Sequence, residues 1–266
     1  MQIGFFDSGI GGITVLHKAI KLIPNEDYLY YADTLHAPYG EKSKEYVKDL
    51  VFHAVEFMTS KGLKALVIAC NTATSAAIGD LRCKYDFPVI GMEPAVKPAV
   101  ELMGNSNKRV LVFATELSLK EDKFQDLVKK VDHRHIVDYI PLPKLVRFAE
   151  GFQFDSPKVQ EYLESILSGI NMMNYGAVVL GCTHYPFFKD LFARLLPKDI
   201  LIVDGNLGTV KNLKRILTQN NNKPEGTGQI DFYQSGVKIE DMDVVRRYYG
   251  LMERLDRMDN EKQAEV

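Results

Sequence analysis

Cysteine is scarce in this 266-residue chain, with Cys70, Cys83 and Cys182 as its three examples. The number is odd, the spacings are wide and no CxxC pair occurs, which argues against a disulfide framework and a zinc ribbon. The histidines other than His184 also lack the spacing of metal ligands, so we expect no metal site. Free thiols are typical of a reducing compartment, and we therefore expect a cytoplasmic protein.

An excess of one charge and long apolar runs are missing as well. The 33 Lys and Arg against 35 Asp and Glu leave a net charge of −2. Nucleic acid and anionic membrane surfaces both favour a strongly basic face, so neither is expected as a partner. The longest apolar runs, such as residues 65–70, are far shorter than the roughly 20 residues of a membrane helix. The first residues also lack the pattern of a secretory signal.

What the sequence does contain is a regular alternation of short apolar runs with helical patterns. The runs at residues 2–6, 27–32, 65–69, 110–113 and 177–180 read as strands, and the last three show no polar alternation, as expected when both faces are covered. Apolar residues at helical spacing predict helices at 13–23, 41–60, 74–85, 120–131 and 187–196. This order predicts an α/β fold with parallel sheets. The charged segment after Leu251 is expected to be a solvated helix.

An internal repeat indicates two related halves. The run 65–72 ends in Cys70-Asn-Thr and the run 177–184 ends in Cys182-Thr-His, at an offset of 182 − 70 = 112. The runs 3–8 and 110–115 match in the same way at an offset of 110 − 3 = 107. The two offsets are similar, so the sequence predicts two α/β halves, the second beginning near residue 96.

The two repeated cysteines are candidates for chemistry. Ligands of parallel α/β sheets bind beyond the carboxyl ends of the strands, where Cys70 and Cys182 both fall. A thiol at a helix N-terminus has a lowered pKa, which we expect for both. Two acid/base groups on opposite faces of one carbon can invert a stereocentre. We therefore expect both sulfurs to face one cleft with room for a small amino acid, and Cys83 to be structural.

Three other interpretations are open at this point. Gly9-x-Gly11 after a strand, with Asp33 further on, partly fits a dinucleotide fingerprint, although Thr14 replaces its third glycine. Cys182 and His184 fit a Cys-His hydrolase, which leaves Cys70 without a role. A non-catalytic amino-acid-binding protein needs neither thiol.

Five motifs give the sequence a family resemblance. These are Asp7-Ser-Gly-Ile-Gly-Gly12, Ala32-Asp33 followed by Pro38-Tyr-Gly-Glu-Lys42, Cys70-Asn-Thr-Ala73, Gly91-Met-Glu-Pro94 and Gly181-Cys-Thr-His-Tyr-Pro186. In this order they resemble the glutamate racemases of the cofactor-independent aspartate/glutamate racemase superfamily. The resemblance implies two pseudo-symmetric parallel-sheet α/β domains with the active site in the cleft between them. It also implies that residues 96–207 form a second domain inserted into a first domain of residues 1–95 and 208–266.

The resemblance further implies the site residues and the activity. It implies interconversion of L- and D-glutamate without a cofactor, supplying D-glutamate for peptidoglycan, and it leaves a homodimer open. The implied catalytic residues are Cys70, Cys182, Asp7, His184 and Glu150. The implied substrate contacts are Asp7, Ser8, Tyr39, Gly40, Asn71, Thr72, Thr115, Ser118, Thr183 and His184. The polar residues at the strand ends include no Lys or Arg, so we expect hydroxyls, amides and helix N-termini to bind the substrate carboxylates.

One loop departs from the family pattern. The family commonly has Gly-Thr-x-x-Thr where this chain has Ala114-Thr115-Glu116-Leu117-Ser118. Ser118 keeps the hydroxyl, while Ala114 lacks the conformational freedom of glycine. An aspartate racemase or a broad acidic amino-acid racemase remains the nearest alternative activity. Aspartate racemases typically have an acidic residue after Gly-Cys-Thr, where this chain has His184.

Overall fold

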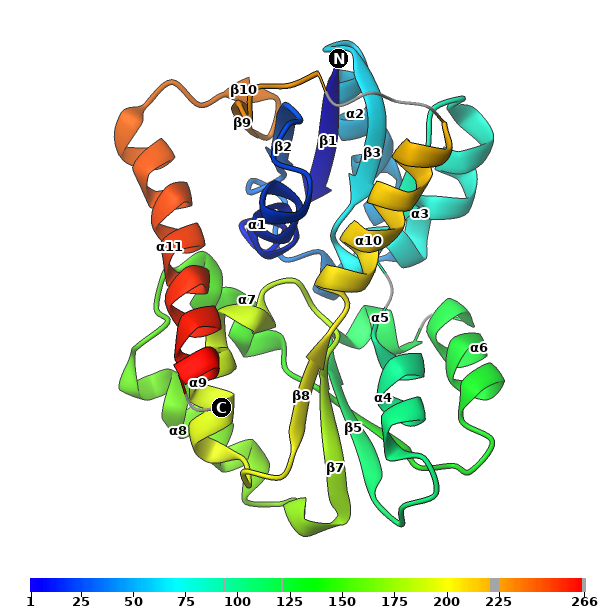
Figure 1. Ribbon diagram of the computed structural model, residues 1–266, viewed down its shortest axis with the longest axis vertical. Helices are drawn as coiled ribbons and strands as arrows, with labels where there is room; N and C mark the ends of the chain where they lie inside the picture. Colours follow the sequence, from blue (N-terminus) through cyan, green and yellow to red (C-terminus); the bar gives the residue numbers. More distant parts are fainter. Residues whose placement is uncertain (93, 121, 221–224, 265–266) are drawn as a thin grey trace.

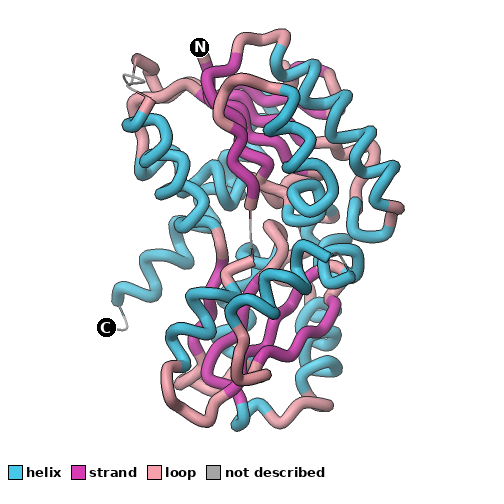
Figure 2. Tube along the Cα trace, turned by 90° about the vertical axis from the view of Figure 1, so that its right-hand side faces the viewer, coloured by secondary structure: helices cyan, strands magenta, loops and turns pink. Residues whose placement is uncertain are grey.

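Two parallel β-sheets, one above the other along the long axis, organise the computed structural model (Figures 1 and 2). The structure describes residues 1–92, 94–120, 122–220 and 225–264. The first sheet has the order β10-β9-β2-β1-β3-β4 and the second the order β6-β5-β7-β8. Within them, only β10 runs antiparallel to its neighbour. The α/β fold expected from the alternation of apolar runs is confirmed.

The strands of the first sheet are β1 (Gln2–Asp7), β2 (Tyr28–Ala32), β3 (Leu63–Ile68), β4 (Val89–Gly91), β9 (Ile230–Gln234) and β10 (Val237–Lys238). Those of the second are β5 (Arg109–Ala114), β6 (Val137–Pro141), β7 (Tyr175–Leu180) and β8 (Leu201–Asp204). Eleven α-helices lie in the described ranges: α1 (Ile13–Leu22), α2 (Lys44–Thr59), α3 (Asn71–Lys84), α4 (Val96–Met103), α5 (Glu116–Lys120), α6 (Asp122–Val131), α7 (Pro143–Glu150), α8 (Pro157–Leu167), α9 (Lys189–Leu195), α10 (Asn206–Gln219) and α11 (Met242–Ala264). Short 3-10 helices are η1 (Tyr39–Glu41), η2 (Met172–Asn174) and η3 (Tyr185–Phe188).

The internal repeat corresponds to a repeat in strand pairing. β1 lies between β2 and β3, and β5 lies between β6 and β7. The register shifts at the same place in both halves, so that Ile3 pairs with Ala65 and Val110 with Ala177. The differences, 110 − 3 = 107 and 177 − 65 = 112, equal the two sequence offsets. Cys70 and Cys182 therefore stand two residues beyond equivalent strand ends, Ile68 and Leu180.

Three hydrophobic clusters explain why the strands show no polar alternation. One face of the first sheet packs on α2 and α3, through residues such as Val51 and Ile78. The outer face of the second sheet packs on α4, α5 and α6. The other faces of both sheets belong to one continuous cluster, which α1, α7, α8, α9, α10, α11 and η3 share. Because this cluster joins the two sheets, it fixes the position of their strand ends relative to each other.

Several expected elements differ from the structure. The helix expected at 120–131 is confirmed as α6, whereas the short helix α5 before it is not among the expected elements. The helix expected at 187–196 begins with η3. The helix expected at 41–60 begins at Lys44, because Ser43 Oγ accepts a hydrogen bond from the backbone N–H of Tyr46 and caps it. The expectation of a solvated C-terminal helix is wrong in part, since Met252 and Leu255 are buried.

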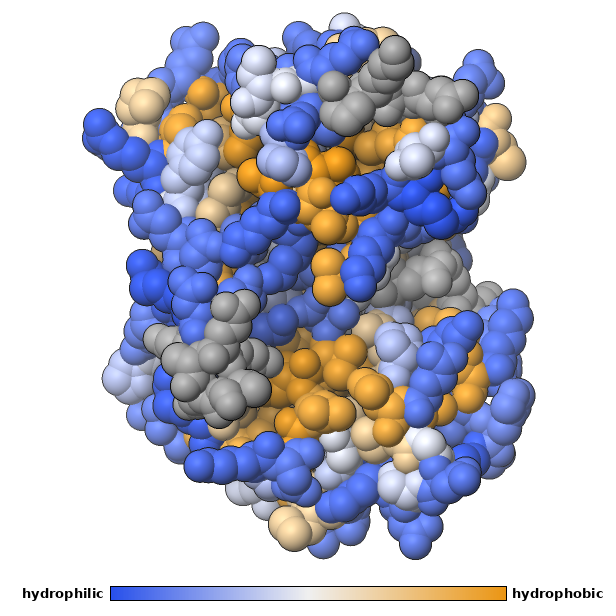
Figure 3. Space-filling model, viewed as in Figure 1, coloured by the Kyte–Doolittle hydropathy of each residue, from blue (hydrophilic) through white to orange (hydrophobic). Residues whose placement is uncertain are grey.

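The surface of the view in Figure 3 is mostly hydrophilic, with apolar side chains gathered over β8, an edge strand of the second sheet. Leu201 on this strand is 48% exposed. Among the described residues, no helix is long and apolar enough to cross a membrane.

Candidate active site

Both cysteines line one small cavity between the carboxyl ends of the two sheets. Its volume is about 20 Å³, and it is lined by Ser8, Pro38, Tyr39, Gly40, Cys70, Asn71, Thr72, Thr115, Val146, Cys182, Thr183 and His184. The expectation that the two thiols face one cleft is therefore met. The expected room for an amino acid is not there, because about 10–15 Å³ is the space of a single water.

The environment of Cys70 keeps its thiol protonated. Its sulfur accepts a hydrogen bond from the backbone N–H of Ala73 at 3.5 Å, at the N-terminus of α3, and lies 3.6 Å from Ser8 Oγ. Burial and the nearby Asp7 carboxylate raise the pKa of Cys70 to about 12. The lowered pKa that the helix N-terminus predicts is thus wrong for Cys70, because the single N–H does not offset burial and the Asp7 charge.

Asp7 is fully buried at the end of β1 and connects the two halves. One carboxylate oxygen accepts the backbone N–H of Gly9, and the other accepts the hydroxyl of Thr183, each at 3.0 Å. Burial raises the pKa of Asp7 to about 6, although the hydrogen bonds and His184 oppose the shift. At neutral pH this carboxylate is mostly ionised.

The environment of Cys182 differs, because an imidazole stands beside its sulfur. His184 Nδ1 lies 3.6 Å from Cys182 Sγ, and His184 Nε2 lies 2.6 Å from Glu150 Oε1. Burial lowers the pKa of His184, but the hydrogen bonds to Cys182 and Glu150 outweigh it and hold the pKa well above its usual range. The resulting imidazolium donates toward both partners and stabilises negative charge on the Cys182 sulfur.

Glu150 lies in the second half of the chain, and a backbone N–H of the first half donates a hydrogen bond to it. Its Oε1 atom also accepts the backbone N–H of Ile10 at 2.9 Å. The glycines of the first turn make this approach feasible, since a Cβ on Gly9 would lie 1.8 Å from that same oxygen. A Cβ on Gly11 would lie 2.3 Å from Thr183 Oγ1. The glycine-rich turn therefore packs against side chains of the site, which argues against the dinucleotide interpretation.

Three hydroxyls from both halves form a buried cluster at the edge of the cavity. Thr72 Oγ1 lies 3.0 Å from Thr115 Oγ1 and 3.2 Å from Ser118 Oγ, and Thr115 donates to Ser118 at 2.9 Å. Hydroxyls both donate and accept, so this cluster can reorganise around a carboxylate. Among the described lining residues of the cavity there is no Lys or Arg.

The structure brings all the expected site residues together, as lining residues or as their hydrogen-bond partners. Cys83 is exposed on α3 and remote from the cavity, so it is not a packed core residue. Sequence reasoning missed Val146 as a lining residue and Asp33 as the acceptor of the Tyr39 hydroxyl. Within the described ranges, no three His, Cys, Asp or Glu residues are grouped as metal ligands would be.

The site and fold agree with comparisons to known proteins. Residues 15–213 match the Asp/Glu/Hydantoin racemase family, so the chain belongs to this family and is a racemase, an isomerase. It is 55% identical to glutamate racemase 2 of Bacillus subtilis (strain 168) over 256 residues, which cover 96% of this chain and 97% of that protein.

Solved structures give the same result. Glutamate racemase isoform RacE1 from Bacillus anthracis superposes with a TM-score of 0.79 at 27% identity, covering 94% of each chain. Glutamate racemase from Francisella tularensis subsp. tularensis SCHU S4, in complex with D-glutamate, gives a TM-score of 0.75 at 30% identity. That match covers 88% of this chain and 87% of the other.

Proposed function

We propose that the protein interconverts L- and D-glutamate by proton transfer at Cα between two cysteines, without a cofactor. The observation that carries the proposal is the pair of thiols at equivalent strand ends of two related halves, lining one buried cavity. The high identity to a glutamate racemase and the D-glutamate complex of a structural relative support glutamate as the substrate.

The surroundings of the two sulfurs suit opposite roles in the first turnover. Cys182 stands beside the His184 imidazolium and is the base, so its sulfur takes the Cα proton as the C–H bond breaks. The electron pair left on Cα spreads into the substrate carboxylate. Cys70, held as a thiol, then delivers its proton to the opposite face, forming a new C–H bond. The reverse direction exchanges the two roles.

The other site residues support the two thiols and hold the substrate. We assign Glu150 to orient His184, and Asp7 to keep Cys70 protonated and to position Thr183. The carboxylates of the substrate are held by hydroxyls, amides and backbone N–H groups. The remaining proposed contacts are Ser8, Tyr39, Gly40, Asn71, Thr72, Thr115 and Ser118.

The proposal extends to the domain organisation of the chain and to the use of its product in the cell. We propose that residues 96–207 form a domain inserted into one of residues 1–95 and 208–266, which the return of β9 to β2 and the packing of α10 on α1 support. The product would serve as D-glutamate for peptidoglycan, which predicts growth without added D-glutamate when the gene is supplied to a bacterium lacking its own racemase. The cytoplasmic location and a homodimer stay predictions.

Substituting each thiol in turn tests the mechanism. Serine is a far weaker acid than cysteine, so Cys70→Ser or Cys182→Ser should nearly abolish racemisation in both directions, because each turnover uses both groups. Exchange of the Cα proton with solvent, or elimination of a β-leaving group, needs only the first abstraction. Each variant should keep that partial reaction for one enantiomer, and the enantiomer should differ between the two variants.

The readout is deuterium incorporation from heavy water, with L- and D-glutamate and with both aspartate enantiomers. Cys83→Ser is the matched control and should leave both directions unchanged. Racemisation near the parent rate in either active-site variant would contradict the two-thiol mechanism. Faster exchange on aspartate than on glutamate would favour the alternative substrate.

A further inference from the structure

A second, larger cavity lies beside the catalytic one. Its volume is about 450 Å³, against about 20 Å³ for the cavity that holds the two thiols. The larger volume lies within the about 300–1,000 Å³ typical of small-molecule sites. It is bounded by α3 of the first half, by α5 and α6 of the second, and by Met92 and Pro94 of the connection between the halves.

One layer of side chains separates the two cavities. Asn71 lines both of them. Ser118 lines the larger cavity, while its hydroxyl bonds to Thr72 and Thr115, which line the smaller one. Asn71 and Ser118 therefore form part of the wall between the larger cavity and the cavity of the two thiols.

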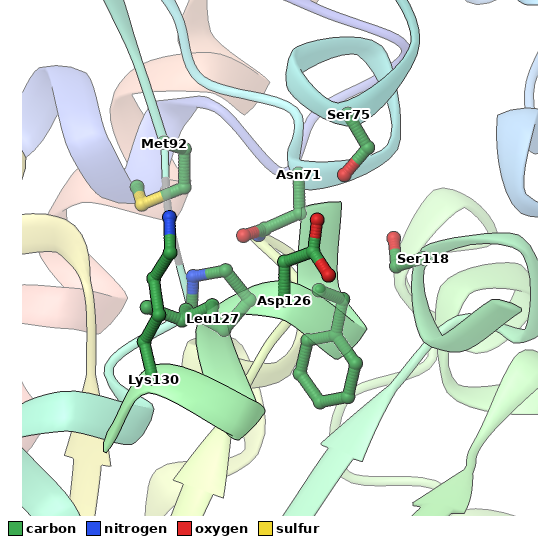
Figure 4. A pocket seen from close by; sticks show the side chains of 9 residues that line it. Asn71, Ser75, Met92, Ser118, Asp126, Leu127 and Lys130 are labelled. Atoms are coloured by element: carbon green, nitrogen blue, oxygen red, sulfur yellow. The ribbon is translucent and has the colours of Figure 1, made fainter. Parts of the chain in front are cut away.

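Asn71 carries an unsatisfied hydrogen-bond acceptor at the wall between the two cavities. Its side-chain oxygen is buried and has no partner among the described residues, and the whole residue is only 6% exposed. Figure 4 shows this side chain reaching into the space next to Met92, Leu127 and Lys130. A buried acceptor without a donor is unfavourable, so the site is suited to an incoming donor such as an ammonium group.

The remaining walls suit a small amino acid. Leu127 and Met92 provide apolar surface, while Asp126 and Lys130 bring one carboxylate and one ammonium from α6 (Figure 4). A zwitterion with an ammonium and a carboxylate group matches both charges.

We propose that the 450 Å³ cavity is the entrance chamber of the active site, where the amino-acid substrate binds first. Asn71 then accepts a hydrogen bond from the substrate ammonium group as the substrate moves into the catalytic cavity. The identity of the substrate rests on the proposed function, whereas the route to the thiols does not. The route is tested without any racemisation, by the rate at which iodoacetamide alkylates the cysteines.

Filling the chamber should slow alkylation of the buried thiols. Leu127→Trp on α6 and Ser75→Met on α3 narrow it from opposite walls. In each variant we expect the alkylation rates of Cys70 and Cys182, read by mass spectrometry of their peptides, to fall at least tenfold. Cys83 is exposed and serves as the internal control, with an unchanged rate. His133→Trp, at an exposed position just beyond the same helix, should change none of the three rates.

The competing route passes the exposed ion pair between Arg147 of α7 and Glu41 of η1. Arg147→Gln opens that side and should leave alkylation of both buried thiols unchanged. The proposal is overturned if the folded Leu127→Trp and Ser75→Met proteins react at the parent rate. Faster alkylation in Arg147→Gln would then assign the route to the side of the ion pair. With glutamate, the two chamber variants should lose kcat/KM tenfold for both enantiomers. If the parent protein racemises neither glutamate nor aspartate but the chamber variants are alkylated more slowly, the proposed function is refuted and the route through the chamber is supported.

Discussion

At the scale of single residues, the site combines buried charge with close backbone approach. Asp7 is ionised at neutral pH although no part of it reaches solvent, and it raises the pKa of Cys70. A buried carboxylate whose pKa is raised binds a proton more tightly in the folded state than in the unfolded state. The protein therefore loses stability through Asp7 as the pH rises from about 4 to about 6.

Asp7→Asn should remove this pH dependence. The folded pKa of about 6 against the ordinary 3.8 corresponds to a stability cost on the order of 3 kcal/mol at pH 7, most of which is absent at pH 4. Asparagine is neutral at both pH values. Relative to the parent, the variant should thus gain on the order of 3 kcal/mol between pH 4 and pH 7, measured by urea unfolding.

Other contributions of the side chain, such as its bonds to Gly9 and Thr183, act at both pH values and cancel in this comparison. An identical stability difference between variant and parent at pH 4 and at pH 7 would mean that the pKa of Asp7 is not raised. The same variant should racemise slowly, because Cys70 loses the charge that keeps it protonated.

Residue types and spacing were sufficient to predict the two thiols, since Cys70 and Cys182 occupy repeated strand ends. Residue types and spacing were not sufficient to predict the pKa of the Cys70 thiol. The pKa of Cys70 depends on burial and on Asp7, which lies 63 residues earlier in the chain (70 − 7 = 63). Glu150 could be placed beside His184 only through the family resemblance, because no local pattern links an α7 residue to the loop after β7.

At the scale of elements, the short helix η1 brings Tyr39 and Gly40 to the cavity, and a buried carboxylate anchors it. Asp33, at the end of β2, accepts the hydroxyl of Tyr39 at 2.6 Å and that of Ser235, in the β9–β10 turn, at 2.9 Å. His36 Nδ1 lies 2.9 Å from the same carboxylate. Asp33 is therefore a positioning residue for one wall of the site.

Asp33→Asn should weaken substrate binding more than catalysis. The amide replaces one acceptor oxygen with a donor, so at least one of these hydrogen bonds is lost, and bonds to charged groups contribute about 1.5–3 kcal/mol. We expect KM for both enantiomers to rise up to about tenfold, with kcat within about twofold of the parent, because η1 carries neither thiol. Steady-state racemisation assays measure both values.

Asp231→Asn is the matched control, since this carboxylate lies in β9 of the same sheet and contacts Gln2 and Lys238 away from the cavity. A fall in kcat without a change in KM in the Asp33 variant would show that Asp33 does not act through η1.

The elements themselves were predictable where the apolar period was strong, as for α1, α2 and the buried strands. Boundaries were harder wherever a loop carries site residues. Sequence periodicity predicted α6, but it did not predict the short helix α5, which carries Ser118. Ser118 is buried by its bonds to Thr72 in the other half, a tertiary contact that no local pattern reveals.

At the scale of the whole molecule, α11 fastens the two halves together on one side of the site. It runs from the first half down alongside α9 of the second (Figure 1). Asp256 and Asp259 pair with His17 and Lys18 of α1, in the first half. Arg254, in contrast, donates to groups of the second half, and one of these is the carbonyl of Phe187 in η3. The turn that carries Cys182 and His184 leads directly into η3.

Arg254→Gln should lower the stability of the whole protein. The guanidinium side chain is only 13% exposed and donates to both oxygens of Asp155, at 2.9 and 3.0 Å, and to Asp190 at 3.2 Å. Removing one partner of a largely buried ion pair costs about 3–5 kcal/mol, because the other charges are left without compensation. Asp155 is 75% exposed and regains water, so we expect a loss near 3 kcal/mol, about 6–12 °C in Tm for a chain of this size.

Thermal unfolding followed by circular dichroism measures this loss, with Arg246→Gln as the control. Arg246 lies on the same helix, is 73% exposed and pairs with an equally exposed Asp243, so its removal should cost less than about 1 kcal/mol. If α11 fastens the second half through Arg254, the midpoint should fall markedly in the first variant and hardly in the second. Equal midpoints for the two variants would place the contribution of α11 in its apolar face, through Leu251 and Leu255, instead of in its ion pairs.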